Sequence, residues 1–255
     1  MNIKSFFTGV LPLVFLIGCN STPPYNPYKV DKSIISKNVK RIGVMPTSVL
    51  VATEGDKSDY FNSELVNTFE NKGFEVVAPN EWVNIYKSIK EGSGDLYDPK
   101  TGEPNKEKLK SIRNKAREIY FNKFDVDAIL YSGVMGVKAN WNVNSATWDG
   151  VEESTTGKDG FWAHMTTPQA YGTIGALSFF VSIEDTQEKD LFLDFGGLQL
   201  RQHLSGRDFI PVEKEKILSD NNVNSNGIRL STCRFFEIWE PPVKNKKGRI
   251  KGCRK

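Results

Sequence analysis

The residues best suited to covalent chemistry in this chain are its three cysteines, Cys19, Cys233 and Cys253. A thiolate can be acylated, oxidised to a disulfide or used as a metal ligand. Cys233 and Cys253 are predicted to pair, because two cysteines in an oxidising compartment are free to form a disulfide. They lie far from His164 and His203 and match no recognised zinc spacing, so no metal and no cofactor are predicted.

Cys19 has a different context. It follows a start bearing one cation, Lys4, and a short apolar run from Phe6 to Ile17. That order is typical of a secretory signal, and the run is too short to cross a bilayer permanently. The ending Leu16-Ile17-Gly18-Cys19 resembles the lipobox of bacterial lipoproteins.

The lipobox resemblance implies cleavage before Cys19 and attachment of fatty-acyl chains such as palmitate to this residue. Asn20 follows the cysteine, whereas enteric-type sorting favours Asp there for retention at the inner membrane. The expected location is therefore the periplasmic side of the outer membrane, reached through the lipid. The alternative is a free cysteine buried at the end of an uncleaved helix.

No catalytic constellation is evident. Neither His164 nor His203 lies beside a serine or cysteine in a recognised motif. The segment Gly92-Ser93-Gly94-Asp95 lacks the Gly-Lys-Ser/Thr ending of a phosphate-binding loop. The remaining candidates are carboxylates, which we interpret as solvated turns: Asp125, Asp127, Glu152, Glu153 and Asp185. The chain is therefore not predicted to be an enzyme.

Length and composition favour one domain. The 255 residues are 38% hydrophobic and 25% charged, which is typical of a globular protein. The predicted divisions are a signal peptide over 1–18, a proline-rich tether over 19–38, a single α/β domain over 39–240 with an insertion at 138–173, and a basic tail over 241–255.

The basic tail holds seven cations and no acid between Lys244 and Lys255, in a chain of net charge +3. Such a run can contact anionic lipid or an acidic protein face, and it can also be a solvated terminus. Nucleic acid is not an expected partner of an exported protein.

The hydrophobic pattern alternates between strands and helices, which predicts an α/β fold with a mixed sheet flanked by helices. Strands are predicted at 40–51, 74–77, 124–134, 177–184, 190–200 and 228–239, with Pro46 marking a bulge or edge in the first. Helices are predicted at 58–72, 81–89, 106–121 and 212–218. The strands at 177–184 and 190–200 form a predicted hairpin, and the last strand carries Cys233.

Several of these segments carry a resemblance. The strand K-R-I-G-V-M-P, the strand V-D-A-I-L-Y-S-G and the hairpin S-F-F-V-S-I-E-D-T-Q-E-K-D-L-F resemble periplasmic lipoproteins of the TolB N-terminal type. That group includes the curli-secretion lipoprotein and lipoprotein activators of penicillin-binding proteins. The resemblance covers about 39–200 and implies a non-catalytic adaptor or assembly role at the cell envelope.

The insertion at 138–173 is polar and glycine-rich, yet it holds several aromatic residues. Exposed aromatics are enriched where proteins bind one another, which makes this segment the candidate surface for an envelope protein or another copy of the chain. The candidate residues are Trp141, Trp148, Trp162 and Tyr171. Rings folded back over the sheet, a carbohydrate-binding protein or hydrolase, and a curli-type secretion-pore subunit are the alternatives.

Overall fold

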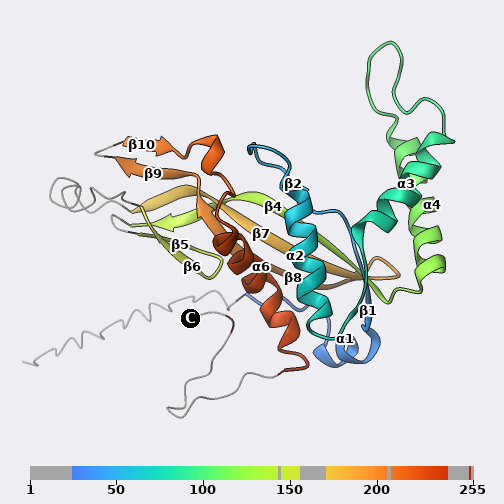
Figure 1. Ribbon diagram of the computed structural model, residues 1–255, viewed down its shortest axis with the longest axis horizontal. Helices are drawn as coiled ribbons and strands as arrows, with labels where there is room; N and C mark the ends of the chain where they lie inside the picture. The colour runs from blue at the N-terminus through green and yellow to red at the C-terminus, as the bar shows by residue number, and fades with distance from the viewer. Residues whose placement is uncertain (1–24, 143–144, 156–170, 206–207, 241–252, 254–255) are drawn as a thin grey trace, which may run out of the picture.

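The computed structural model describes residues 25–142, 145–155, 171–205, 208–240 and 253. It is an α/β fold, in which a mixed eight-stranded sheet is flanked by five helices (Figure 1). The predicted fold class is therefore confirmed. A second, two-stranded sheet pairs β9 (Gln202–Ser205) with β10 (Asp208–Pro211).

The sheet is organised around one long strand, β4, which pairs with β7 over its whole length. On its other edge β4 pairs in turn with β1, β2 and β5, the first two parallel and the third antiparallel. The strands are β1 (Arg41–Val44), β2 (Ser48–Val49), β3 (Glu75–Val77), β4 (Ala128–Trp141), β5 (Ser145–Trp148), β6 (Val151–Ser154), β7 (Gly172–Asp185) and β8 (Asp190–Leu200).

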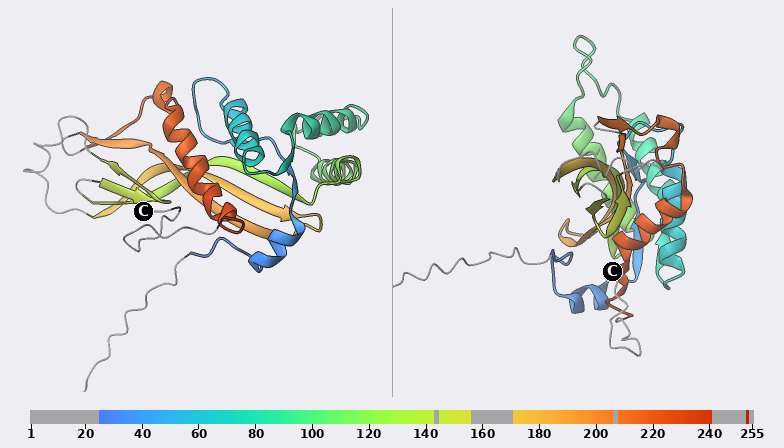
Figure 2. Two further views of the ribbon diagram at one scale, coloured as in Figure 1. Left: turned by 60° about the horizontal axis from the view of Figure 1, so that its bottom comes forward. Right: turned by 90° about the vertical axis from the view of Figure 1, so that its left-hand side faces the viewer.

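Both faces of the sheet carry helices (Figure 2). Side chains alternate between faces along a strand, so Leu130 joins the core beneath α2 and α6, whereas Ile129 packs with α3 and α4. The helices are α1 (Lys32–Asn38), α2 (Ser58–Glu70), α3 (Pro79–Glu91), α4 (Lys106–Phe124) and α6 (Asn221–Phe236). The helix predicted at 212–218 is only a 3-10 turn over Lys214–Lys216.

The hairpin prediction is confirmed by the antiparallel pairing of β7 with β8. Asp185 closes its turn, because the Oδ1 atom accepts hydrogen bonds from the backbone N–H groups of Gln187 (2.8 Å) and Lys189 (3.0 Å). This carboxylate therefore stabilises a turn rather than standing free in solvent.

Pro46 has a different place from the one predicted. The strand expected over 40–51 is divided into β1 and β2, with Pro46 in the gap. β1 lies between β3 and β4, whereas β2 pairs with β4. Because proline has no N–H to donate, the break in the ladder falls where that donor is missing.

The strand predicted at 228–239 is wrong, because residues 228–236 lie in α6 and the next three form a turn. Its residues buried against the sheet include Gly227, Ser231 and Phe235, at helical spacing. Gly227 lets the helix lie very close to β8: a Cβ atom on Gly196 would come 1.9 Å from the Gly227 carbonyl oxygen. Small residues thus set the closest approach, while the apolar side chains of Ile228, Phe235 and Phe236 join the core.

The predicted tether is also too long. Residues 27–29 lie beside β8, where the Lys29 N–H donates to the Leu191 carbonyl (3.0 Å) and the Leu193 N–H donates to the Pro27 carbonyl (2.9 Å). Helix α1 follows and buries Ile35 completely. The domain therefore begins well before the predicted boundary at residue 39.

Candidate functional site

Part of the predicted insertion forms regular structure at the far end of the sheet. β4 continues to Trp141, and β5 and β6 form a hairpin joined by Asp149 and Gly150. Both linking residues have positive φ, 36° and 84°. An Asp-Gly pair is a preferred two-residue hairpin turn, and it is the signal from which the sequence analysis could have predicted this hairpin. The described part of the insertion is thus mainly an extension of the sheet.

Trp148 is a core residue and not a partner contact. Only 7% of its surface is exposed, and it packs with Ala146, Ile174 and Leu200. Its indole Nε1 donates a hydrogen bond to the Leu177 carbonyl at 3.0 Å. The alternative in which aromatic rings fold back over the sheet therefore holds for this residue.

Carboxylates fasten the β5–β6 hairpin to the sheet beneath it. Asp149 Oδ2 accepts a hydrogen bond from the Ser178 hydroxyl at 2.6 Å, and Glu153 Oε2 accepts one from the Leu200 N–H at 3.0 Å. Burial raises the pKa of Glu153, although the Leu200 hydrogen bond acts in the opposite direction. These groups hold backbone and neighbouring side chains in place.

The carboxylates before β4 also have structural partners. Asp127 Oδ2 accepts hydrogen bonds from the N–H groups of Lys40 and Arg41, both at 2.8 Å. Asp125 ends α4 in the left-handed conformation, with φ of 49°. The two residues therefore shape the crossover into β4, as the turn interpretation predicted.

Several aromatic and apolar side chains remain on the surface at the same end of the sheet. Tyr171 is 77% exposed, and the next residue, Gly172, pairs with Trp141 across β4 and β7. The Trp141 ring is half-buried and meets the Phe209 ring edge-on, with centroids 5.1 Å apart. Phe209 and Ile210 on β10 are 38% and 43% exposed. We call Trp141, Tyr171, Phe209 and Ile210 the terminal aromatic surface.

The terminal aromatic surface keeps two of the four predicted contact residues, Trp141 and Tyr171. It adds Phe209 and Ile210, which sequence analysis missed. These two lie in a short polar region without strong periodicity, and β9–β10 pairing places them at the end of β4. Trp162, His164 and Cys19 lie outside the described residues.

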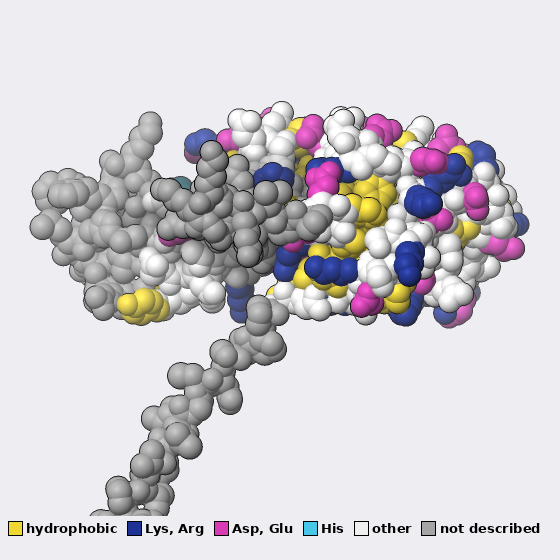
Figure 3. All heavy atoms as spheres, turned by 90° about the horizontal axis from the view of Figure 1, so that it is seen from below, with side chains coloured by type: hydrophobic (Ala, Val, Ile, Leu, Met, Phe, Trp, Pro, Cys, Tyr) yellow, Lys and Arg dark blue, Asp and Glu magenta, His cyan; other side chains and the backbone are white. Residues whose placement is uncertain are grey.

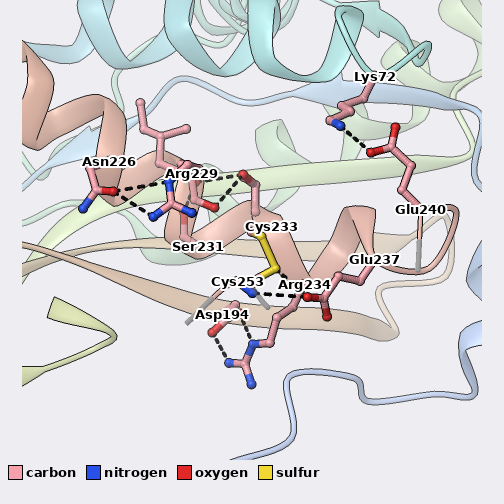
Figure 4. The surroundings of a disulfide bond; sticks show 12 residues. Lys72, Asp194, Asn226, Arg229, Ser231, Cys233, Arg234, Glu237, Glu240 and Cys253 are labelled. Atoms are coloured by element: carbon pink, nitrogen blue, oxygen red, sulfur yellow. Dashed lines mark hydrogen bonds and ion pairs between the residues drawn. A yellow bond between two sulfur atoms is a disulfide. The ribbon is translucent and has the colours of Figure 1, made fainter. Parts of the chain in front are cut away.

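The predicted disulfide is present between Cys233 and Cys253, whose Cα atoms are 5.5 Å apart (Figure 4). It attaches residue 253 to helix α6, not to a strand as the sequence analysis expected. Both cysteines line a cleft of about 620 Å³ between α2 and α6, together with Thr68, Arg229 and Phe236.

Glu237 lies beside the disulfide and accepts a hydrogen bond from the Cys253 N–H at 3.3 Å (Figure 4). Within the described residues, Cys233, Glu237 and Cys253 are the one group close enough to hold a metal ion. Because the two sulfur atoms are bonded to each other, they are not thiolate ligands. This cluster is therefore a structural crosslink.

Replacing Cys233 and Cys253 with serine should lower the free energy of unfolding by about 3 kcal/mol, because a crosslink restricts the unfolded chain. Urea unfolding of oxidised wild type, reduced wild type and the double variant checks this. The last two should agree closely. Equal midpoints for the oxidised and reduced wild type would contradict a stabilising role.

No helix in the described residues has the length and apolar character needed to span a membrane. The chain matches no protein-family model, and comparison with curated proteins and with solved structures finds nothing similar. The TolB-type resemblance and the function that it implies therefore stay predictions.

Proposed function

We propose that this chain is a lipoprotein of the outer membrane that acts as a non-catalytic adaptor or assembly factor in the periplasm. One observation carries the proposal. The disulfide joins Cys233 and Cys253, so Cys19 is the one of the three cysteines that is not part of it. A disulfide is typical of an oxidising compartment, and Cys19 closes the Leu-Ile-Gly-Cys segment that resembles a lipobox. The two features agree with an exported chain anchored by lipid.

The start of the domain constrains how far it can stand from the membrane. Tyr25 is already attached to the domain, since its hydroxyl donates to the Leu193 carbonyl at 2.6 Å. Six residue steps separate Cys19 from Tyr25, and an extended chain of that length spans at most about 20 Å. A lipid on Cys19 would therefore hold this edge of the domain close to the bilayer.

The side chains near Tyr25 suit such a position. Lys29 lies over the Tyr25 ring (5.5 Å), and Lys32 lies over the Tyr28 ring (4.3 Å). In Figure 3, hydrophobic side chains gather in the middle of one face, with lysine and arginine side chains beside them. Cations beside aromatic rings suit a membrane surface, where both polar and apolar groups are available.

The partner would bind at the terminal aromatic surface. Tyr171, Phe209 and Ile210 on it are exposed, and aromatic side chains supply much of the binding energy in protein interfaces. The burial of Trp148 weakens the carbohydrate alternative, because that ring is not free to stack on a sugar. The secretion-pore alternative predicts a ring of copies, which the size of the isolated complex would reveal.

The lipid anchor gives the first test of this proposal. Metabolic labelling with a fatty acid should mark the wild type and leave Cys19→Ala unmarked. Membrane fractionation should follow the same pattern, because stable anchoring requires the acyl chains. Equal labelling of wild type and Cys19→Ala would sink the lipoprotein assignment.

The partner surface gives the second test. The double variant Tyr171→Ala/Phe209→Ala should bind its partner at least about 30-fold more weakly, corresponding to roughly 2 kcal/mol. The melting temperature should fall only by the contribution of the contact between the Phe209 and Trp141 rings, because Tyr171 is 77% exposed. Crosslinking in intact cells, with the lipidated protein as bait, identifies the partner or a second copy.

The matched control is Tyr97→Ala, since Tyr97 is 57% exposed but lies in the loop between α3 and α4. Tyr97→Ala should retain the crosslinked species that the double variant loses. Retention of all crosslinks by the double variant would remove the terminal aromatic surface from the proposal.

A further inference from the structure

A second cleft lies on the opposite side of the sheet from α2 and α6, beside the end of β1. Its volume is about 550 Å³, which is within the range of small-molecule sites. Figure 1 places α3 and α4 together at this end of the sheet. Its lining comes from the segment after β1, from α3, α4 and β4, and from the end of β7 with the turn that follows it.

Arg117 is held rigidly in this cleft. Its side chain is 11% exposed, and its Nη1 and Nη2 atoms donate to the Tyr131 hydroxyl and the Asp185 carbonyl, both at 3.0 Å. The guanidinium also lies over the Phe121 ring at 5.0 Å. A cation fixed by several contacts is preorganised, so it loses little freedom when a ligand binds.

Two carboxylates lie near Arg117 at distances longer than a direct charged hydrogen bond. Glu184 Oε2 is 3.7 Å from Nη1, and Glu188 Oε1 is 3.5 Å from Nε. Direct charged hydrogen bonds are typically about 2.7–2.9 Å long, so both pairs are loose. Burial raises the pKa of Glu184, while the charge of Arg117 lowers it. These oxygens have room to accept a hydrogen bond from a second cation.

Arg113 provides a cation that the fold does not use. It precedes Arg117 by one helical turn on α4 and is exposed. Among the described residues it forms no ion pair or hydrogen bond, whereas Arg117 forms both. The cleft thus combines two arginines and two glutamates with apolar surface from Met45 and Trp82.

From this arrangement we propose that the cleft binds a small zwitterion, namely an amino acid or short peptide with a free amino and a free carboxyl group. The ligand carboxylate binds Arg113 and Arg117, and its ammonium group binds Glu184 and Glu188. The charges of the lining select this class: a dianion such as phosphate meets two carboxylates, and a polyamine meets two arginines. The cleft and its charges do not depend on the lipid anchor or on the terminal aromatic surface.

The probe is alanyl-alanine, titrated into the full-length protein by calorimetry at neutral pH. Two blocked forms test the two charged ends of the dipeptide one at a time: N-acetyl-alanyl-alanine lacks the ammonium group, and alanyl-alanine amide lacks the carboxylate. Each blocked form should bind at least about tenfold more weakly than the free dipeptide. No binding of the free dipeptide at about 10 mM, or equal binding of all three, overturns the proposal.

Variants locate the binding in the cleft. Arg113→Gln should weaken the binding of alanyl-alanine about tenfold, because it removes a partner of the ligand carboxylate. Glu188→Gln should have a similar effect, because it removes a partner of the ligand ammonium group. Both residues are exposed, so melting temperatures should stay near that of the wild type. Lys115→Gln is the control, because Lys115 is exposed on α4 but does not line the cleft. Unchanged affinity in both cleft variants would place the ligand elsewhere and refute the assignment.

Discussion

Replacing Trp148 with alanine should lower the free energy of unfolding by about 3–5 kcal/mol. The ring is buried between the β5–β6 hairpin and the sheet, so its removal leaves a cavity among Ala146, Ile174 and Leu200. It also leaves the Leu177 carbonyl without the indole N–H that it accepts from. An unpaired buried acceptor adds its own cost.

Urea unfolding with Tyr171→Ala as the control measures this effect. Tyr171 lies on the terminal aromatic surface and is 77% exposed, so its substitution should change stability by less than about 0.5 kcal/mol. Trp148→Ala should therefore lose stability, whereas Tyr171→Ala should keep its stability and lose association with the partner. A stable Trp148→Ala protein that no longer binds its partner would show that this ring is a contact residue.

The hairpin of β7 and β8 was predictable because its signals are local. Two apolar runs flank Asp185, whose side chain can accept hydrogen bonds from the turn backbone, as it does from Gln187 and Lys189. The Cys233–Cys253 pair was predictable for another reason, since only these two cysteines remain once Cys19 is assigned to lipid. Neither inference needed knowledge of distant contacts.

Helix α6 was not predictable in this way. Ile228, Thr232, Phe235 and Phe236 favour strands by type and Gly227 disfavours a helix, although the spacing of the four residues fits one buried helix face. The local preference is overridden by packing, because Gly227 and Gly196 let the helix axis approach β8 closely. That contact joins residues 31 positions apart, which no window of the sequence contains.

The candidate sites, too, were predictable from the sequence only in part. Tryptophan content marked the insertion correctly as unusual, but composition does not say which rings are buried. Trp148 is fixed inside by a hydrogen bond to β7, whereas Tyr171 lies outside at the start of that strand. The cleft around Arg117 had no sequence signature, since its residues come from several elements that are far apart in the sequence.

The ion pair between Asp194 and Arg234 should be as important to stability as Trp148. Asp194 interrupts the apolar strand β8 with a fully buried side chain, and Arg234 on α6 binds it through two nitrogen atoms, with Nε 2.6 Å from Oδ2. Arg234 also donates to the Tyr25 carbonyl at 3.1 Å. The pair therefore links β8, α6 and the start of the domain.

Asp194→Leu should lower the free energy of unfolding by about 3–5 kcal/mol, because it leaves a mostly buried guanidinium without its carboxylate. Arg234→Met should cost a similar amount, since it leaves Asp194 charged and buried. The double variant Asp194→Leu/Arg234→Met should recover most of the loss, because apolar groups of similar volume often replace a buried pair without net cost. Urea unfolding of all four proteins gives the coupling energy.

The surface pair of Lys72 and Glu240 is the matched control. Its atoms are 2.6 Å apart, but its side chains are 37% and 63% exposed, so Glu240→Ala should cost no more than about 1 kcal/mol. Arg234→Met should also expose the chain near Tyr25 to proteases, because it removes the donor to that carbonyl. If the double variant were as unstable as the sum of the single variants, the two side chains would act independently. The link between the N-terminal segment and α6 would then depend on contacts other than this pair.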